Sequence, residues 1–491
     1  MRRRDFVKTT ALATAAAPFI LSSCRFQNRN RPNVLFIAVD DLNSWVGCVG
    51  GHPNSRTPNI DRLASRGTVF TNAHCQGPIC GPSRTSLMTG LYPHTTGIYG
   101  QIADEDIRKA HPKTASSVFL TEYFGLNGYD TRGIGKLYHI GAPKGAFGTY
   151  AGRVPGFGPV PPEPFKWDGK TGRPDYEHTS TDWGVFPEDD SLMPDYQSAQ
   201  WAIEQLDLLG AQPFFLGVGF LRPHVPWLVP QKWFDLHPLE EIETPPYRPM
   251  DLSDVPDIAR RIAELPQMPT TDWAIENDEW KKIVQAYLAC VSFADHYVGE
   301  ILDALESSEH ADNTVVVLWA DHGYHIGEKG RFGKHSLWEE ATQVPLIMSG
   351  PGITQGQSCS MPVGNIDIYP TLVDLCRLPE NPQNEGNSLG PLLEDSSAAW
   401  DYVALTTYGR NNHAVRDEHY RYIRYEDGSE ELYDHRTDSD EWTNIAAAPE
   451  MATEKERLMQ HLPAVNGPWS PVAVMKFNEY FREHSAREAA R

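Results

Sequence analysis

The chain has 491 residues, of which 40% are hydrophobic and 11% aromatic, and a mass of 55.0 kDa. This composition excludes a disordered or fibrous protein, because it can bury enough apolar surface to offset the entropy of ordering. The formal net charge of −22 argues against a nucleic-acid partner, since the overall field repels polyanions. An anionic substrate would therefore need a local basic pocket.

Residues 1–23 are typical of a bacterial export signal. Basic residues at positions 2–4 precede the apolar run Ala11–Leu21, which is too short to span a bilayer. The arginine pair resembles a twin-arginine signal, and residues 21–24 resemble a lipobox in which Cys24 is acylated after cleavage. We expect an exported protein of the periplasm or cell surface, with membrane contact only through a lipid anchor at Cys24. An ordinary secretory signal is the alternative.

Three short apolar runs, each ending at charged residues, predict buried strands. They span Val34–Val39, Phe214–Phe220 and Val315–Ala320, and such near-continuous runs are typical of parallel strands covered on both faces. Helical periodicity lies between them, most clearly over Ile283–Leu305. Strands that alternate with helices predict an α/β fold with helices on both faces of the sheet.

The later part of the chain predicts a second, smaller unit. Residues 141–176 are rich in glycine and proline and predict a long loop without regular elements, and the polar stretch Asn381–Gly390 is typical of a linker. Beyond it, Tyr420–Tyr425 and Glu431–Tyr433 flank an Asp-Gly turn and predict an antiparallel hairpin. We expect a large α/β domain over residues 31–380 and a C-terminal α+β subdomain over 391–491.

Seven cysteines are present, and their spacing fits neither a zinc site nor a disulfide framework. One of them opens the pentapeptide Cys80–Arg84, with the sequence CGPSR. A Cys-x-Pro-Ser-Arg match arises by chance in this chain on the order of once in a thousand. Pro82 suits the first turn of a helix that Gly90 can end, so residue 80 would lie at a helix N-terminus, which attracts oxyanions. A buried cysteine before an ordinary helix is the alternative.

Acidic residues follow two of the predicted strands. Asp40 and Asp41 come directly after the first strand, and two adjacent ionised carboxylates repel each other unless a cation neutralises them. Asp321 and His322 follow the third strand, and ligands of open parallel sheets bind beyond the carboxyl ends of the strands. Both pairs can therefore meet at one edge of the sheet as a metal site. A solvated Asp-Asp turn is the alternative.

These motifs resemble the type I, formylglycine-dependent sulfatases of the alkaline-phosphatase-like superfamily. The resemblance covers most of the chain and is carried by residues 31–41, 57–64, 80–84, 87–90 and 135–139. The motif sequences at residues 222–226, 321–324, 333–336 and 432–434 are most similar to those of the iduronate-2-sulfatase branch. The resemblance implies a large mixed, mostly parallel sheet flanked by helices and a smaller C-terminal domain with an antiparallel sheet.

The resemblance also implies a modified residue and a metal. Cys80 would be oxidised to formylglycine, also called 3-oxoalanine, by a formylglycine-generating enzyme. One divalent cation, usually Ca²⁺, would be held by the residues that match the family's ligands. Because imidazole is a softer donor than oxygen, Mg²⁺ and Mn²⁺ stay open as alternatives. The implied ligands are Asp40, Asp41, Cys80, Asp321 and His322.

The implied reaction is hydrolysis of a sulfate ester through a covalent sulfo-enzyme at oxidised Cys80. By family position, His224 would protonate the leaving alcohol and His139 would deprotonate the second hydroxyl of the hydrated aldehyde. The implied catalytic set is Cys80, Arg84, Lys136, His139, His224 and Lys334. In it, Arg84 and the two lysines would neutralise the sulfate oxygens. Taken singly, the two histidines and the two lysines are typical of surface or structural positions. Weaker candidates for substrate contact are Arg222, Trp227, Arg331 and His335.

The substrate implied by the branch is a sulfated poly- or oligosaccharide carrying a 2-O-sulfated uronate. Algal polysaccharides such as ulvan or carrageenan, aryl sulfates and choline sulfate are alternatives. Phosphonate monoesters and phosphodiesters are a second enzymatic class that also uses a formylglycine. A non-enzymatic alternative is a saccharide-binding lipoprotein in which Cys80 stays unmodified.

Overall fold

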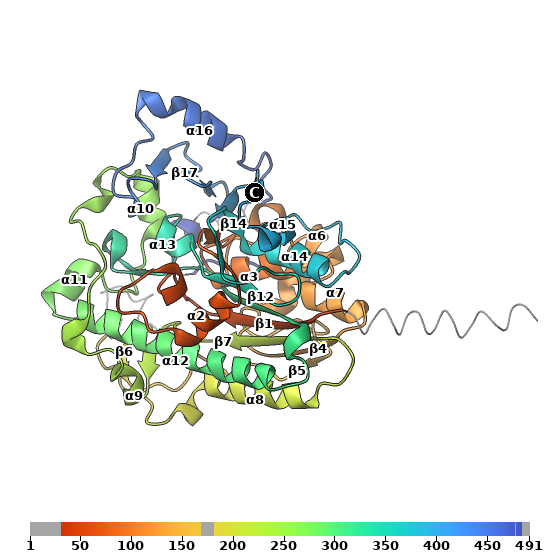
Figure 1. Cartoon of the computed structure of the whole chain (residues 1–491). Helices are drawn as coiled ribbons and strands as arrows, with labels where there is room; N and C mark the ends of the chain where they lie inside the picture. Colours follow the sequence, from red (N-terminus) through yellow and green to blue (C-terminus); the bar gives the residue numbers. More distant parts are fainter. Residues whose placement is uncertain (1–30, 168–180, 477, 484–491) are drawn as a thin grey trace, which may run out of the picture.

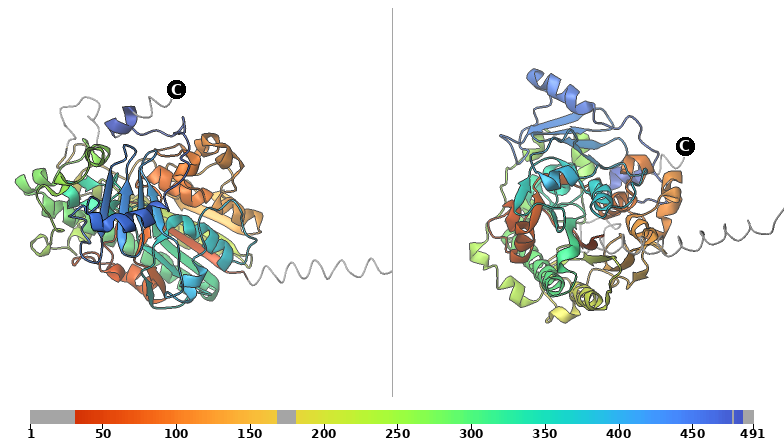
Figure 2. Two further views of the ribbon diagram at one scale, coloured as in Figure 1. Left: turned by 90° about the horizontal axis from the view of Figure 1, so that it is seen from above. Right: turned by 45° about the vertical axis from the view of Figure 1, so that its right-hand side comes forward.

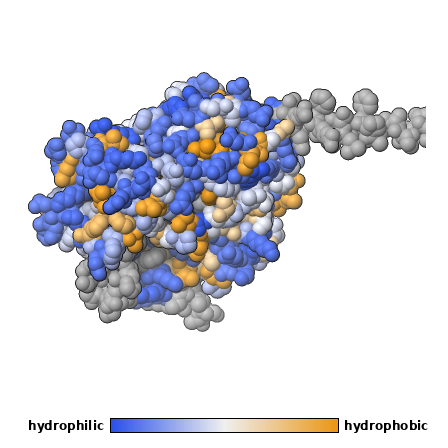
Figure 3. Space-filling view, turned by 90° about the horizontal axis from the view of Figure 1, so that it is seen from below, coloured by the Kyte–Doolittle hydropathy of each residue, from blue (hydrophilic) through white to orange (hydrophobic). Residues whose placement is uncertain are grey.

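The structure is a computed structural model that describes residues 31–167, 181–476 and 478–483. The predicted signal over residues 1–23 and the lipid anchor at Cys24 lie outside these residues. None of the helices in the described ranges combines the length and the apolar character needed to cross a membrane. The face shown in Figure 3 is mostly hydrophilic, and its hydrophobic residues form small separate groups.

An eight-stranded mixed sheet forms the centre of the molecule, in the order β13-β2-β12-β9-β1-β7-β4-β5. The central strand β1 runs parallel to β9 and β7, with Val34 opposite Val315 and Phe215, whereas β12 runs antiparallel to both of its neighbours. Every residue of β1, β7 and β9 is buried, which explains their apolar runs. The strands are β1 (Asn33–Val39), β2 (Gly67–Phe70), β4 (Asp130–Gly135), β5 (Thr149–Tyr150), β7 (Phe214–Phe220), β9 (Thr314–Ala320), β12 (Leu346–Ser349) and β13 (Gln357–Cys359).

Helices cover both faces of this sheet, as predicted (Figure 1). On one face lie α8 (Pro194–Leu208) and the 27-residue α12 (Trp280–Glu306), which contact each other. On the other face α3 (Cys80–Thr89) contacts α7 (Leu120–Leu126) and α14 (Ile368–Leu375). The predicted helix over Ile283–Leu305 is confirmed, because α12 buries that periodic face.

A four-stranded antiparallel sheet follows near the C-terminus and confirms the predicted hairpin. In it β17 pairs with β18, and Gly428 in the connecting turn has a φ of 89°, which glycine adopts without strain. One face packs against α16 (Ala452–Met459), which lies on the outer side of the sheet in Figure 2. The strands are β15 (Ala404–Thr407), β16 (His413–Arg416), β17 (Tyr420–Arg424) and β18 (Glu430–Asp434).

Buried ion pairs attach this sheet to the α/β domain. Glu339, the first residue of α13 (Glu339–Thr342), pairs with Arg421 of β17 and, at 3.3 Å, with Arg416 of β16. The Nε of Arg421 also lies 2.7 Å from the Glu441 carboxylate. Because all four side chains are nearly fully buried, each charge depends on its partners.

Two expectations about loops need correction. The glycine- and proline-rich segment contains β5, whose two residues pair with Arg132 and Gly133 at the edge of the main sheet. The stretch Asn381–Gly390 is packed rather than free, because the Gln383 amide donates to the Thr89 carbonyl at the end of α3 over 2.9 Å. A polar side chain of this stretch hydrogen-bonds to the main chain of the α/β domain. Composition alone does not distinguish such a packed segment from a solvent-exposed linker.

Candidate active site

Two acidic pairs meet at the carboxyl edge of the main sheet. Asp40 and Asp41 follow β1, and Asp321 and His322 follow the neighbouring parallel strand β9, as expected from the sequence. All four are buried, and the backbone amide of Asp41 donates to the Asp321 carboxylate over 3.2 Å. Asp41 has a φ of 61°, in the left-handed region that is unfavourable for most residues with a side chain, and such residues are enriched at functional sites.

Cys80 faces these acids from the first turn of α3. The helix begins at Cys80 and ends at Gly90, which has a left-handed φ of 71° as the sequence predicts. The backbone amide of Gly81, which has no partner within the helix, donates to the side-chain oxygen of Gln101 over 2.8 Å. The N-terminus of α3 therefore places residue 80, with partial positive charge behind it, at the end of β1.

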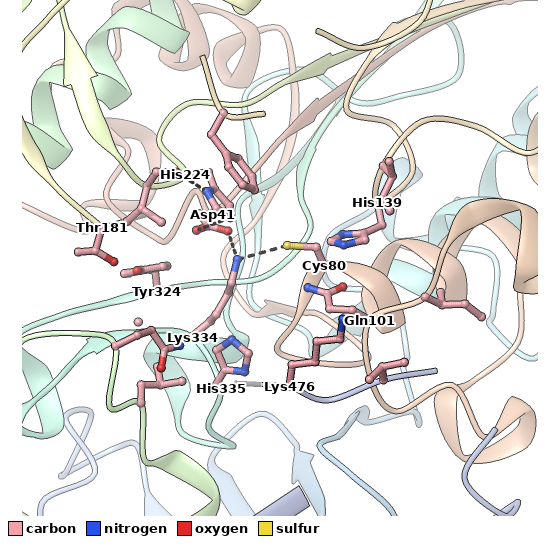
Figure 4. Close-up of a pocket in the computed structure, with 18 of the residues that line it drawn as sticks. Asp41, Cys80, Gln101, His139, Thr181, His224, Tyr324, Lys334, His335 and Lys476 are labelled. Carbon is pink, nitrogen blue, oxygen red and sulfur yellow. Dashed lines mark hydrogen bonds and ion pairs between the residues drawn. The ribbon is translucent and has the colours of Figure 1, made fainter. Parts of the chain in front are cut away.

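The Cys80 thiol lies among cationic groups (Figure 4). Its Sγ is 3.2 Å from His322 Nε2, 3.2 Å from Lys334 Nζ and 3.6 Å from Lys136 Nζ. Burial raises the pKa of the Cys80 thiol, but the charges of Lys136, Lys334 and His322 outweigh this effect and hold the pKa well below its ordinary value. Position 80 is therefore a place where negative charge is stabilised.

Four side chains offer a set of ligand atoms for a metal ion. The ligand atoms of Asp40, Asp41, Cys80 and His322 all lie within 4.8 Å of one another. The Oδ2 of Asp41 is buried and has no hydrogen-bond partner among the described residues, so it is available to a cation. Carboxylate oxygens are the donors that hard divalent cations prefer, and the residues present therefore fit such an ion.

Asp321 stands slightly apart from these four side chains. Its Oδ2 accepts from Arg84 Nε over 2.9 Å and lies 3.5 Å from His322 Nε2. The structure thus brings Asp321 to the predicted metal site but directs one of its oxygens to a guanidinium group.

Three buried cations surround Cys80 and pair with the acids of the site. Lys334 Nζ lies 2.6 Å from Asp41 Oδ1, Lys136 pairs with Asp40, and Arg84 bridges Asp40 and Asp321. This is the local basic pocket that an anionic substrate requires in a protein with a net charge of −22. It would attract the oxygens of a tetrahedral anion bound next to residue 80.

Two histidines lie on different sides of Cys80 in Figure 4. His224 Nδ1 is 2.7 Å from the Val225 carbonyl, which directs Nε2 toward Asp41 Oδ2 at 3.8 Å, and burial lowers the pKa of His224. Its ring stacks on Phe157, with centroids 4.3 Å apart and planes inclined by 2°. On the other side, His139 is close enough to Cys80 to lower the pKa of its thiol, and the His139 main chain is held by Asp104 over 3.0 Å. The two imidazoles can thus exchange protons with groups on either side of residue 80.

A cavity of about 490 Å³ opens above Cys80. Its volume is within the range of small-molecule sites. Several lining residues were not predicted as site residues. Of these, only Tyr324 belongs to a motif that the sequence analysis used, at residues 321–324, and the others carry no motif. The missed residues are Gln101, Phe157, Thr181, Tyr324 and Lys476.

Comparison with known proteins gives the family. Residues 32–378 match the family model described as Sulfatase, and residues 327–467 match the model of the N-sulphoglucosamine sulphohydrolase C-terminal region. The chain belongs to the sulfatase family. A sulfatase of Formosa agariphila is 51% identical over 463 residues, which are 93% of this chain and 91% of that protein. Human iduronate 2-sulfatase is 35% identical over 407 residues, 76% of this chain and 67% of that protein.

Solved structures share the fold. The phosphonate monoester hydrolase of Agrobacterium radiobacter superposes with a TM-score of 0.69 at 22% identity, over 88% of this chain and 94% of that one. The predicted family, the mixed, mostly parallel sheet with a C-terminal antiparallel sheet, and the enzyme class, a sulfuric ester hydrolase, are therefore confirmed.

Of the four weaker candidates in this sulfatase, His335 lines the cavity. Arg222 donates to the carbonyls of His224 and Leu228, at 3.2 and 3.1 Å, and so shapes the main chain that carries His224. Trp227 is fully buried in β8 (Trp227–Val229), and Arg331 donates to the Lys334 carbonyl over 2.6 Å. These three side chains support the cavity wall and do not line it.

Proposed function

We propose that this sulfatase removes the 2-O-sulfate of uronate residues in sulfated saccharides, with Cys80 oxidised to formylglycine as the nucleophile. The observation that carries the proposal is the position of Cys80 at the start of α3, among three buried cations and three potential metal ligands. The choice of a 2-O-sulfated uronate is supported by the 35% identity to human iduronate 2-sulfatase.

Two groups complete the proposed site. As a hydrated aldehyde, residue 80 would supply two geminal hydroxyls, one to attack sulfur and one whose deprotonation releases sulfate, whereas a thiol or a serine offers no second hydroxyl. A divalent cation, proposed as Ca²⁺ because oxygen donors predominate, would supply a Lewis acid held by Asp40, Asp41, His322 and the oxygen that replaces Cys80 Sγ. Asp321, whose Oδ2 lies 3.5 Å from His322 Nε2 and pairs with Arg84, would be a further ligand of this ion.

The remaining residues bind charge and move protons. Lys136, Lys334 and Arg84 bind the sulfate oxygens and stabilise the charge that develops on them in the transition state. His224 protonates the leaving sugar oxygen from Nε2, because its Nδ1 is held by the Val225 carbonyl. His139, which contacts residue 80 from the other side, accepts the proton of the second hydroxyl.

The test pairs a mass measurement with substrate hydrolysis. The protein would be produced together with a formylglycine-generating enzyme, and the peptide containing Cys80 should lose about 18 Da on oxidation of the thiol to the aldehyde. Sulfate release is then measured with 2-O-sulfated uronides, ulvan and carrageenan oligosaccharides, choline sulfate and 4-nitrophenyl sulfate. Faster release from the uronides supports the proposal, and faster release from any other ester overturns the substrate assignment.

Two further outcomes would overturn more of the proposal. Modified residue 80 with hydrolysis of phosphonate monoesters and none of sulfate esters would assign the other formylglycine-dependent reaction class. A cysteine that stays unmodified despite the maturation enzyme would favour a saccharide-binding protein.

We also propose export and lipid anchoring, on the basis of the N-terminal sequence. The arginine pair and the sequence around Cys24 support them. A Cys24→Ala variant that leaves the membrane fraction would support acylation, and equal partition of both proteins would contradict it.

A further inference from the structure

A lysine from the C-terminal segment reaches into the cavity above Cys80. Lys476 lines the cavity, and Figure 4 shows its side chain extending toward Gln101. The segment is fixed by a pair of main-chain hydrogen bonds, from Gln101 N to Val474 O over 2.8 Å and from Val474 N to Gln101 O over 2.7 Å. Because Gln101 in turn holds the first turn of α3, the main chain at Val474 has a defined place relative to residue 80.

Lys476 differs from the other cations of the site, because it has no acidic partner among the described residues. Lys136, Lys334 and Arg84 are each paired with a buried carboxylate. Lys476 makes no hydrogen bond or ion pair with any of the residues that the structure describes. Asp106, an acid on the cavity wall, is already paired with Lys109 at 2.6 Å. Besides the cations next to Cys80, the cavity is thus lined by an ammonium group that has no counter-charge within the part of the chain that the structure describes.

The wall around Lys476 is largely apolar. Ile102, Leu265, Met268, Val472 and Val474 line the cavity together with it. Apolar walls strengthen the attraction between an ammonium group and an anion, because they exclude part of the solvent that screens it. Lys476 itself is exposed, so in a protein of net charge −22 its ammonium group is available to an anion that enters the cavity.

We infer that Lys476 binds a second anionic group of the substrate, the uronate carboxylate, and thereby determines specificity. The inference rests on the proposed function, since it assumes a substrate that carries a carboxylate on the sulfated ring. The paired cations next to Cys80 hold the sulfate, and Lys476 holds the carboxylate at the other end of the same sugar. Lys476 is thus a binding residue that takes no part in the bond-breaking step.

The test compares two esters that differ in one charge. The first is a 2-O-sulfated uronide with a free carboxylate, and the second is its methyl ester, which has nearly the same shape but no negative charge. For Lys476→Gln we expect kcat/KM for the free acid to fall about tenfold through KM, as loss of one solvent-accessible charge-assisted hydrogen bond would produce. The methyl ester should be hydrolysed at an unchanged rate.

Two variants serve as matched controls. Lys476→Arg keeps the charge and should retain most of the preference for the free acid. Lys144→Gln removes the same charge from an exposed lysine that does not line the cavity, and it should behave like the parent enzyme. Equal values for Lys476→Gln and the parent on the free acid, or equal losses on both esters, would overturn the inference.

A different result would refute the proposed function instead. If the parent enzyme releases sulfate from neither uronide but does so from another ester, the uronate assignment fails and the inference about its carboxylate fails with it. If the parent hydrolyses both uronides and Lys476→Gln hydrolyses them equally well, only the role of Lys476 is refuted.

Discussion

Phe157 offers a specific test of how His224 is positioned. The two rings lie parallel, with centroids 4.3 Å apart, and the same Phe157 ring has the Lys136 ammonium 5.5 Å from its centroid. Phe157 belongs to the segment after β5, where Arg153 donates to the His139 carbonyl over 3.0 Å. If His224 protonates the leaving group, replacing Phe157 by alanine should disturb that proton transfer.

The size of the effect follows from the stacking. Aromatic pairs of this kind contribute about 0.5–1.5 kcal/mol beyond the area they bury. At about 1.36 kcal/mol per factor of ten in rate, Phe157→Ala should lower kcat roughly 2- to 13-fold. His224→Ala removes the general acid itself and should lower kcat by about 10²–10⁴.

The leaving group provides the assay. Protonation matters for a sugar ester, whose alkoxide leaves poorly, and matters little for 4-nitrophenyl sulfate, whose phenolate leaves without help. Both variants should therefore be slow on the sugar ester and near normal on the aryl ester. Phe165→Ala is the control, because Phe165 belongs to the same long segment, is 44% exposed and does not line the cavity. Equal losses of kcat on both esters, or a sugar-ester kcat that Phe157→Ala leaves unchanged, would refute the reasoning.

Three further predictions follow from the site and from the attachment of the C-terminal sheet. Cys80→Ala should abolish sulfate release with little change in melting temperature, because it removes the nucleophile and keeps the helix start; residual turnover would contradict this. Chelation by EDTA should lower both activity and melting temperature, because Asp40 and Asp41 lose a neutralising cation, and Ca²⁺ should restore both; unchanged melting would count against a bound metal. Arg421→Met should cost about 3–5 kcal/mol in urea unfolding, because it leaves Glu339 and Glu441 buried without their main partner; a loss below about 1 kcal/mol would refute this role.

The parts predictable from sequence are those governed by local patterns. The buried strands β1, β7 and β9 are recognisable in the sequence as apolar runs. The parallel arrangement of β1 and β9 brings Asp40 and Asp321 to one edge of the sheet. The start of α3 follows from Pro82, and its end follows from Gly90. In these cases the chemistry of a few neighbouring residues decides the structure.

The remaining lining residues depend on contacts between distant segments. Phe157 and Lys476 reach the cavity from irregular chain, and no periodicity indicates where such chain packs. Lys476 is placed by a main-chain pairing between residues 101 and 474, and main-chain pairing leaves no side-chain signature. Likewise, Gln383 caps α3 with the same amide group that a solvated linker would expose.

The burial of Cys80 has a consequence for the order of events in the life of the protein. The side chain is 1% exposed, at the bottom of a cavity and within a helix whose ten residues are all buried. A small ester can enter such a cavity, but the active site of another protein cannot. Any enzyme that oxidises Cys80 must therefore bind the chain while α3 is still unpacked. A molecule that completes folding with an unmodified Cys80 can then no longer be oxidised by that enzyme and stays inactive.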